Sequence, residues 1–398
     1  MFELLKTLPA DPILGLNQIF QKDANPDKIN LSIGVYQNAN GATPIFTAVK
    51  KAEQQLLDLQ STKAYAPQAG DPAFVEHITK LLLGDQLVSR LGDRVATVMT
   101  PGGCGALRMN AELLVQSRDN VTVWVSTPTW ANHFPLLESA GLTLKSYDYY
   151  SPETHAVDFA AMVESLNLMP KGDVVLLHGC CHNPTGADLT QAQWDTVIDI
   201  LAERELVPFI DVAYQGFGDS LADDVYGLRQ AATRLPEVLV ASSCSKNFGV
   251  YRERTGAALV ITATSAQTAA AKSQILSAAR RSYSMSPSHG GSIVGLLLSS
   301  ESLTLEWKAE LESVRTRMNS LRLGLAKGLN DAQSKIDFDF VAESKGMFCY
   351  LGISQEDVLS LRSEFGLYLL ESTRINVAGL SEQNLPIIIQ RVAEVITR

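Results

Sequence analysis

The middle of the chain alternates short apolar runs, rich in β-branched residues, with longer segments of helical periodicity. Segments such as 189–205 carry apolar side chains every three or four residues, which is typical of amphipathic helices. Near-continuous apolar strands separated by helices indicate a mostly parallel sheet covered on both faces. The pattern therefore predicts an α/β fold. The predicted strands lie at residues 121–126, 142–147, 174–178, 207–211, 238–241 and 257–262.

From about residue 303 the pattern changes. A long charged amphipathic helix is expected over about 303–330, and a strand near 347–351 follows it. A smaller α/β domain is completed by a helix opened by Ser354, a strand around 375–377 and a last helix opened by Ser381. The first 44 residues contain no strand–helix alternation of their own, so we expect them to join this smaller domain.

Composition excludes several classes of protein. The 398 residues are 46% hydrophobic, and 33 basic against 43 acidic side chains give a net charge of −10. This balance argues against nucleic-acid binding, which needs a basic face against the phosphates. No apolar run approaches the roughly 18 residues of a membrane span, and the N-terminus lacks the apolar core of a signal peptide. Five sparse cysteines are typical of reduced thiols, so we expect a cytoplasmic protein.

Polar residues follow three of the predicted strands, at the ends where ligands bind in open parallel sheets. Lys246 is the only Lys, Arg, Asp or Glu between Glu237 and Arg252, and Asp211 is equally isolated within 206–218. Isolated charges are costly to bury unless paired, so both are site candidates, with a salt bridge capping the sheet as the alternative. The polar segments are 179–186 (GCCHNPTG), 211–216 (DVAYQG) and 242–246 (SSCSK), and a glycine-rich segment, 100–106 (TPGGCGA), opens a helical stretch.

These groups suit one cofactor. A desolvated lysine has a lowered pKa and can attack a carbonyl group. A lysine, an isolated carboxylate and a glycine-rich anion site match the aldehyde, the pyridine nitrogen and the phosphate of pyridoxal phosphate.

Four motifs, in order and with matching spacing, resemble those of the class I aminotransferases. They are Asn183-Pro184-x-Gly186, Asp211-x-x-Tyr214, Ser243-x-Ser245-Lys246 and, eight residues further on, Arg254. The stretches HGCCHNPTG, AYQGFG, SKNFGVYRERTGA and RINVAGL are similar to those of the aspartate and aromatic amino-acid aminotransferases. The resemblance extends from Asp11 to the last helix, so it covers nearly the whole chain.

The resemblance implies the fold-type-I architecture of aminotransferases. A large cofactor-binding domain with a seven-stranded, mostly parallel sheet is expected at 45–310. An N-terminal arm is expected at 1–12, and a smaller α/β domain is expected from 13–44 and 311–398. The resemblance also implies a homodimer with shared active sites.

For the cofactor, the resemblance implies that Lys246 forms the Schiff base and later moves a proton. Asp211 would keep the ring nitrogen protonated, and Asn183 and Tyr214 would hydrogen-bond the phenolic oxygen, lowering the pKa of the Schiff base. Trp130 is expected to stack on the ring. His133 matches a residue that orients Asp211, although a core histidine remains the alternative.

The phosphate is expected at the helix N-terminus that contains Gly103 and Cys104, where backbone N–H groups favour an anion. Cys104 replaces a residue that usually carries a hydroxyl in this family, and a thiol is a poor donor, so we expect only its backbone N–H to contribute. By resemblance, Tyr65 reaches the phosphate from the neighbouring subunit. The side-chain ligands in the same chain are expected to be Ser243, Ser245 and Arg254.

Arginine forks bind carboxylates with two parallel hydrogen bonds. Arg374 matches the clamp on the substrate α-carboxylate, and Arg280 matches an arginine from the partner subunit that meets a side-chain carboxylate. Arg281 is the adjacent alternative, but the spacing to Tyr283 favours Arg280, which begins a loop-like stretch at 280–289. Other expected substrate contacts are Gly34, Trp130 and Asn183.

Two rival classes fit less well. A nicotinamide dehydrogenase would need a third glycine after Gly103-x-Gly105, where Arg108 stands. A zinc site from His178, Cys180, Cys181 and His182 is spaced too tightly for a tetrahedron, so we expect no metal.

We therefore expect ping-pong transamination of aromatic amino acids and aspartate with 2-oxoglutarate, and no nucleic-acid or membrane partner. A strict aspartate aminotransferase is the first alternative, and a decarboxylase or lyase of the same fold is the second. Two carboxylate-binding arginines favour transamination over the second.

Overall fold

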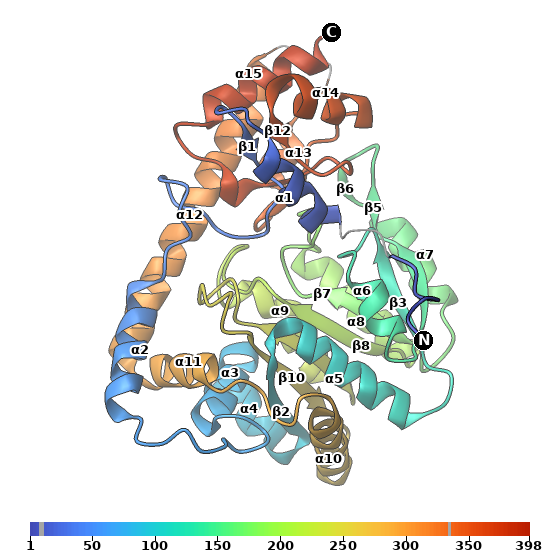
Figure 1. The fold of residues 1–398 in the computed structure, drawn as a ribbon. Helices are drawn as coiled ribbons and strands as arrows, with labels where there is room; N and C mark the ends of the chain where they lie inside the picture. Colours follow the sequence, from blue (N-terminus) through green and yellow to red (C-terminus); the bar gives the residue numbers. More distant parts are fainter. Residues whose placement is uncertain (8–11, 333–335) are drawn as a thin grey trace. The chain divides into compact units, whose positions relative to one another are not determined.

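The computed structural model describes residues 1–7, 12–332 and 336–398 (Figure 1). It divides into two compact units, one made of Met1–Thr43 and Met318–Arg398 and the other of Pro44–Arg317. The domain boundaries expected from the sequence stay predictions. Of the expected N-terminal arm, residues 8–11 lie outside the described residues, as does Asp11, at which the family resemblance begins.

The larger unit is built on one seven-stranded sheet. The spatial order is β2 (Val95–Pro101), β10 (Thr255–Ile261), β9 (Val238–Ser243), β8 (Val207–Val212), β7 (Val174–His178), β3 (Thr122–Thr127) and β4 (Thr143–Asp148). Only β10 runs antiparallel to its neighbours β2 and β9, so the sheet is mostly parallel and the predicted fold class is confirmed. The six strands expected from the sequence are all present, and β2 is the strand that the pattern missed.

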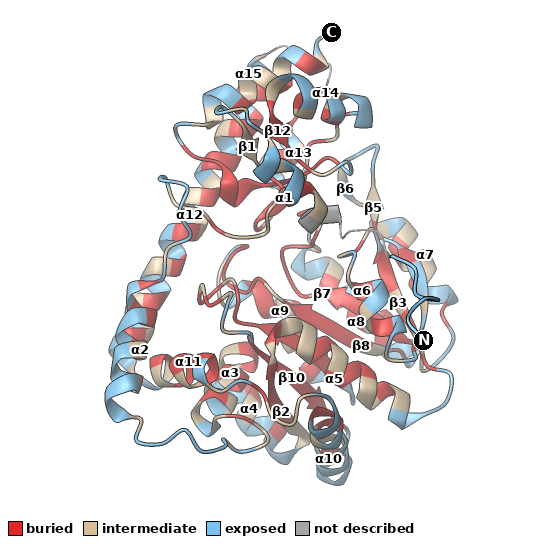
Figure 2. Ribbon diagram, viewed as in Figure 1, coloured by how far each residue is buried: buried red, intermediate tan, exposed pale blue. Residues whose placement is uncertain are grey.

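Helices cover the sheet on both sides. Alternate strand residues such as Val123, Leu176 and Phe209 form one buried cluster with Ala106 and Ile275, which come from α5 (Gly102–Ser117) and α10 (Ser265–Ser282). The intervening strand residues face the opposite side, because side chains alternate along a strand. Figure 2 shows the central strands almost entirely buried. The other elements of this unit are α2 (Thr47–Leu59), α3 (Pro72–Leu83), α4 (Asp85–Leu91), η1 (Gly92–Arg94), α6 (His133–Glu138), β5 (Tyr150–Ser151), β6 (Ala156–Val157), α7 (Phe159–Leu168), α8 (Gln191–Glu203), η2 (Asp223–Val225), α9 (Tyr226–Arg234), α11 (His289–Ser299) and the first part of α12 (Glu301–Asp331).

The smaller unit contains two short strand pairs and several helices. Strand β1 (Ile29–Asn30) pairs in parallel with β12 (Leu367–Tyr368), and β11 (Phe348–Tyr350) pairs antiparallel with β13 (Arg374–Asn376). The first 43 residues contribute β1 and a helix, α1 (Pro12–Lys22), which the sequence pattern did not predict. The remaining elements are α13 (Asp339–Glu343), α14 (Gln355–Phe365), η3 (Val377–Gly379) and α15 (Leu385–Ile396).

Two predicted helix starts have different outcomes. Ser354 caps α14 as predicted, because its hydroxyl accepts from the Asp357 N–H while the Asp357 side chain binds back. The last helix does not begin at Ser381. Its hydroxyl accepts from the Asn384 N–H, which forms a turn that ends before Leu385 opens the helix.

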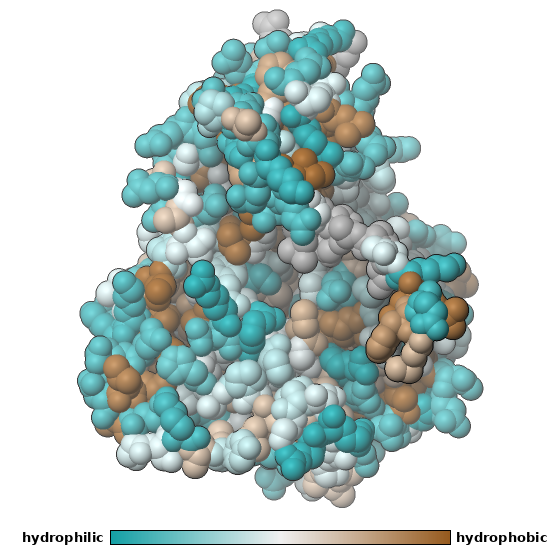
Figure 3. All heavy atoms as spheres, in the orientation of Figure 1, coloured by the Kyte–Doolittle hydropathy of each residue, from teal (hydrophilic) through white to brown (hydrophobic). Residues whose placement is uncertain are grey.

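Most of the viewed face is polar, with apolar side chains in small patches (Figure 3). Within segment 1–7, four apolar side chains are exposed, namely Met1, Phe2, Leu4 and Leu5. Apolar groups gathered on a surface are typical of regions that another chain covers. Among the described residues, the helices include none that is long and apolar enough to cross a membrane.

Candidate active site

The carboxyl ends of β7, β8 and β9 carry the chemistry-bearing segments. His178 at the end of β7 pairs with Asp211 in β8, and Asp211 pairs with Ala241 in β9. Asn183 therefore follows one strand, Tyr214 the next and Lys246 the third, all from the same edge of the sheet. The structure brings together the segments that the sequence analysis selected.

Lys246 lies beside Tyr214, with its Nζ 4.6 Å from the centre of the aromatic ring. Burial lowers the pKa of its ammonium group, while attraction to Asp211 opposes this shift, and the net pKa is below the usual value for lysine. A lowered pKa makes the neutral, nucleophilic amine more accessible. This is the property that an amine needs to attack an aldehyde.

Asp211 is buried and accepts a hydrogen bond from His133, with 3.1 Å between Oδ2 and Nε2. Burial raises the pKa of the carboxyl group, but the bond to His133 and the nearby positive charge of Lys246 outweigh it, so the net pKa is lowered. Asp211 is therefore ionised at neutral pH and can hold a proton on a ring nitrogen. The contact between His133 and Asp211 that the family resemblance implies is present.

Three further residues surround this contact. The Thr129 hydroxyl lies 2.8 Å from His133 Nδ1 and 3.0 Å from His178 Nε2. Burial lowers the pKa of His178 to about 3, so this imidazole is neutral at pH 7. Trp130 packs edge-on against the His133 ring, with 5.3 Å between the ring centres. Trp130 thus lies next to the residue that holds Asp211.

The N-terminus of α5 (Gly102–Ser117) is a candidate anion site. The residue before the helix, Pro101, makes no side-chain cap, so the first N–H groups have no capping side chain. Gly102 has a φ of +72°, and a Cβ there would lie 2.6 Å from Nη2 of Arg254. A Cβ on Gly103 would lie 3.1 Å from Cβ of Ser243. The lack of side chains at these two glycines lets the guanidinium and the serine approach the helix end closely.

Arg254 completes this cradle. Its Nη1 lies 3.5 Å from the Ser245 hydroxyl, and its own backbone has a φ of +51°. A helix N-terminus, an arginine and two serine hydroxyls are together the kinds of group that can bind a phosphate.

Cys104 occupies the first turn of the same helix. Its Sγ lies 4.0 Å from Asn132 Nδ2. Burial raises the pKa of the thiol, although the charge of Arg254 opposes this shift. The thiol is therefore protonated and a weak donor. The expectation that only its backbone N–H binds phosphate remains a prediction.

Two expected substrate residues belong to the smaller unit. Arg374 is buried, and its Nη2 donates to the Ser32 carbonyl at 2.9 Å. Its guanidinium carbon lies 4.1 Å from the centre of the Phe348 ring, and a Cβ on Gly34 would lie 3.2 Å from Cζ of the same ring. Phe348, which the sequence analysis did not single out, is the common surface on which Arg374 and Gly34 lie.

Three expected residues are exposed on the larger unit. Tyr65 is 90% exposed, and Arg280 and Arg281 lie in the last turn of α10. Arg280 contacts the Ser284 hydroxyl, and Arg281 donates to Ser277 at 2.8 Å. The expectation that Arg280 begins a loop was wrong, because the helix continues to Ser282 before the chain turns away.

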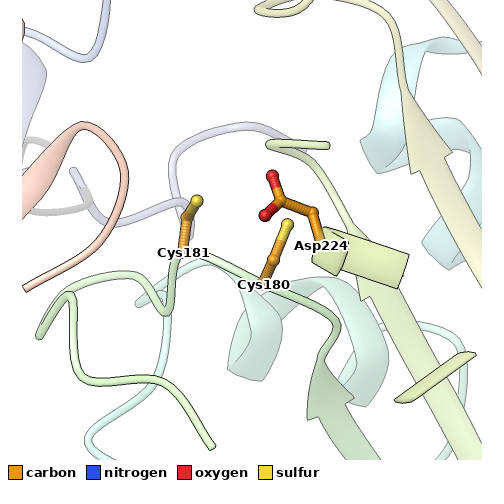
Figure 4. Close-up of side chains that lie close together, drawn as sticks. All are labelled: Cys180, Cys181 and Asp224. Atoms are coloured by element: carbon orange, nitrogen blue, oxygen red, sulfur yellow. The ribbon is translucent and has the colours of Figure 1, made fainter. Parts of the chain in front are cut away.

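Cys180, Cys181 and Asp224 form a buried group whose ligand atoms lie within 4.8 Å of one another (Figure 4). Asp224 Oδ2 accepts from the N–H groups of Gly216 and Gly218, and Oδ1 accepts from Asp219 and Ser220, so backbone donors occupy both carboxylate oxygens. A hydrogen bond with Cys181, together with burial, holds the pKa of Cys180 well above its usual range. These are the interactions of a hydrogen-bonded cluster, and they use the atoms that a metal would need.

Comparison with known proteins agrees with this geometry. Residues 26–392 match the family of aminotransferases of class I and II, and the chain belongs to this family. It is 46% identical over 391 residues to an aromatic-amino-acid aminotransferase of Paracoccus denitrificans, with 98% of each chain covered. It is 44% identical over 396 residues to an aspartate aminotransferase of Escherichia coli strain K12, with 100% of each covered.

The solved structure of a similar protein is described with a cofactor bound. The aromatic-amino-acid aminotransferase of Burkholderia pseudomallei, described as covalently bound to pyridoxal phosphate, superposes with a TM-score of 0.97 at 40% identity, over 100% of this chain and 99% of that one. The protein is a pyridoxal-phosphate-dependent aminotransferase. The residues fit this cofactor, because the cradle at α5 suits its phosphate, ionised Asp211 suits its ring nitrogen and Lys246 suits its aldehyde.

Proposed function

We propose that the protein transfers amino groups from aromatic amino acids and aspartate to 2-oxoglutarate by a ping-pong mechanism. The observation that carries this proposal is the convergence of Lys246, Asp211 and the anion cradle at one edge of the sheet. The breadth of donors is supported by relatives of both names at nearly equal identity, 46% and 44%. A strict aspartate aminotransferase is the alternative that donor kinetics would reveal.

When bound, pyridoxal phosphate supplies an aldehyde that condenses with amines and a protonated ring that withdraws electrons. Lys246 would hold the aldehyde through its Nζ, and once a substrate amine has displaced it, its free amine would remove the proton from the substrate Cα. Asp211, oriented by His133, keeps the proton on the ring nitrogen. Asn183 and Tyr214 would donate to the phenolic oxygen, and Trp130 would stack on the ring.

The remaining cofactor contacts bind the phosphate. Arg254 supplies charge, and the hydroxyls of Ser243 and Ser245 donate hydrogen bonds. The N–H groups of Gly103 and Cys104, at the first turn of α5, add the partial positive charge of the helix end.

The substrate α-carboxylate is bound by Arg374, with help from Asn183 and the backbone of Gly34. The Phe348 ring supports this role, because stacking fixes the plane of the guanidinium and so prepares it for a two-bond contact.

The active unit is a homodimer in this proposal. Tyr65 and Arg280 then serve the site of the neighbouring subunit, the first at the phosphate and the second at a side-chain carboxylate. Their exposure supports such a role, as does the exposed apolar segment 1–7. A cytoplasmic location is also part of the proposal and is supported by five free thiols.

Steady-state kinetics with a panel of amino donors and 2-oxoglutarate tests the proposal. We expect parallel lines in double-reciprocal plots, as a ping-pong mechanism requires, with turnover of aspartate, phenylalanine and tyrosine. Use of aspartate alone would support the strict enzyme, and no glutamate formation from any donor would contradict the proposal.

A further inference from the structure

Two carboxylates outside the cofactor contacts each bind the backbone of a loop that carries a cofactor residue. The first is Asp188, which follows the turn after β7. Its Oδ2 accepts from the Cys181 N–H at 2.6 Å and its Oδ1 from the His182 N–H at 2.7 Å. Asn183 is the next residue along the chain. Asp188 therefore holds the N–H groups of the two residues immediately before Asn183.

The second is Asp224, which is 5% exposed and lies in the middle of η2. Its Oδ2 accepts from Gly216 at 2.7 Å and from Gly218 at 2.9 Å, and its Oδ1 accepts from Asp219 at 2.7 Å. A Cβ on Gly218 would lie 2.6 Å from Oδ1. The loop that follows Tyr214 thus wraps closely around this one carboxylate.

The two loops also contact each other. The Cys181 thiol lies 3.9 Å from the carbonyl oxygen of Tyr214. Cys181 belongs to the turn that Asp188 binds, and Tyr214 begins the loop that Asp224 binds. Figure 4 shows Cys180 and Cys181, from the loop after β7, beside the carboxylate of Asp224. The loops of Asn183 and Tyr214 therefore form one hydrogen-bonded unit.

A carboxylate suits this task because both of its oxygens accept. An asparagine at the same place offers one acceptor oxygen and turns an NH₂ group toward the other backbone donor. Replacing either aspartate by asparagine should therefore release one side of its loop without removing much volume.

We propose that Asp188 and Asp224 are positioning residues that fix Asn183 and Tyr214 in the geometry needed to donate to the phenolic oxygen of the cofactor. This inference rests on the proposed roles of Asn183 and Tyr214. Donors to that oxygen favour the deprotonated form of the Schiff base, so loosening them raises the pH at which the cofactor chromophore titrates. A residue with a merely structural role would lower stability and leave this midpoint unchanged.

The test uses the holoenzyme of Asp188→Asn without substrate. Asp188 is partly exposed, so this variant should fold. The control is Asp158→Asn, because Asp158 also accepts a backbone N–H, from Ala161 at 3.0 Å, at the N-terminus of α7. The measurements are the pH midpoint of the cofactor absorbance and the thermal unfolding temperature of the cofactor-free protein.

We expect Asp188→Asn to raise the midpoint by about half a pH unit or more, and Asp158→Asn to move it by less than ~0.2 unit. In an Asn183→Ala background, the additional shift caused by Asp188→Asn should largely disappear, because the group it positions is gone. Asp224→Asn should shift the midpoint further, since three closely bound N–H groups depend on this carboxylate.

The proposal is overturned if Asp188→Asn has the wild-type midpoint while its unfolding temperature falls as in Asp158→Asn. An undiminished shift in the Asn183→Ala background would equally contradict it. If Asp224→Asn does not fold, the two Asp188 experiments still decide. A wild-type protein whose bound cofactor shows no titration would instead count against the proposed function.

Discussion

The residues at the ends of β7–β9 differ in kind from the residues on the surface of the same unit. Lys246, Asp211 and Arg254 interact electrostatically with Cys104 and form a connected set within one chain. Tyr65 and Arg280 are exposed to solvent. The contrast supports the proposal that most of the groups that hold the cofactor come from one chain. In that proposal a neighbouring chain adds Tyr65 at the phosphate and Arg280 at the substrate side chain.

The largest expected effect comes from Lys246→Ala. Turnover should fall by more than about 10⁴-fold, because the nucleophile and the proton carrier are lost together. Borohydride reduction of the wild type followed by peptide mapping locates the attachment point. The surface variant Lys171→Ala, which removes an exposed lysine paired with Glu205, should retain activity. A label on any lysine other than Lys246 would overturn the assignment.

Asp211→Ala should slow removal of the Cα proton by on the order of 10²–10⁴-fold, while substrate binding weakens much less. The reason is that no ionised carboxylate then holds the proton on the ring nitrogen. Single-turnover absorbance measurements separate the two steps. Rates close to those of the wild type would show that Asp211 does not have this role.

The exposed residues predict a smaller and more selective effect. Arg280→Ala should lower kcat/KM for aspartate by on the order of 10- to 100-fold, the loss of a charge-assisted contact, and affect phenylalanine far less. Arg281→Ala is the matched control on the same helix turn and should change neither value much. Equal losses for both donors would show that Arg280 does not distinguish the two substrate side chains. If Arg281→Ala rather than Arg280→Ala caused the selective loss for aspartate, Arg281 would be the residue that binds the side-chain carboxylate.

The smallest effect concerns pH and stability. Since the pKa of His178 is about 3 when folded and about 6.5 when unfolded, the unfolded chain binds an extra proton between these values. This contribution is fully present above pH 6.5 and is lost as the pH falls toward 3. His178→Gln should therefore reduce the pH slope of the unfolding free energy by about 1.4 kcal/mol per pH unit in this window. Denaturant titrations at several pH values measure the slope, and an unchanged slope would contradict the assignment.

The sequence predicted the central sheet well, for a physical reason. Strands buried on both faces, such as β7, β8 and β9, are nearly continuous apolar runs. Such runs can be recognised in a sequence without knowing which strands pair with them. Strand β2 escaped because Thr97 and Thr100 interrupt its apolar run, although both are buried in the structure.

The residues of the candidate site also fall into those that the sequence revealed and those that it did not. Lys246 and Asp211 were identifiable because isolated charges in apolar surroundings are conspicuous. Asp188 and Asp224 were missed because their partners are backbone N–H groups, and nothing in a sequence shows which of these a loop will direct toward a carboxylate. Phe348 was missed because a buried aromatic residue looks like any other core residue.

Subunit complementation tests most directly whether one active site draws on two chains. A Lys246→Ala chain and an Arg280→Ala chain, each inactive or weak with aspartate, are mixed under conditions in which subunit exchange is demonstrated. One hybrid site should then contain Lys246 from one chain and Arg280 from the other, and aspartate activity should rise well above that of either parent. No gain in activity despite proven exchange would place Arg280 in the site of its own chain and contradict the account.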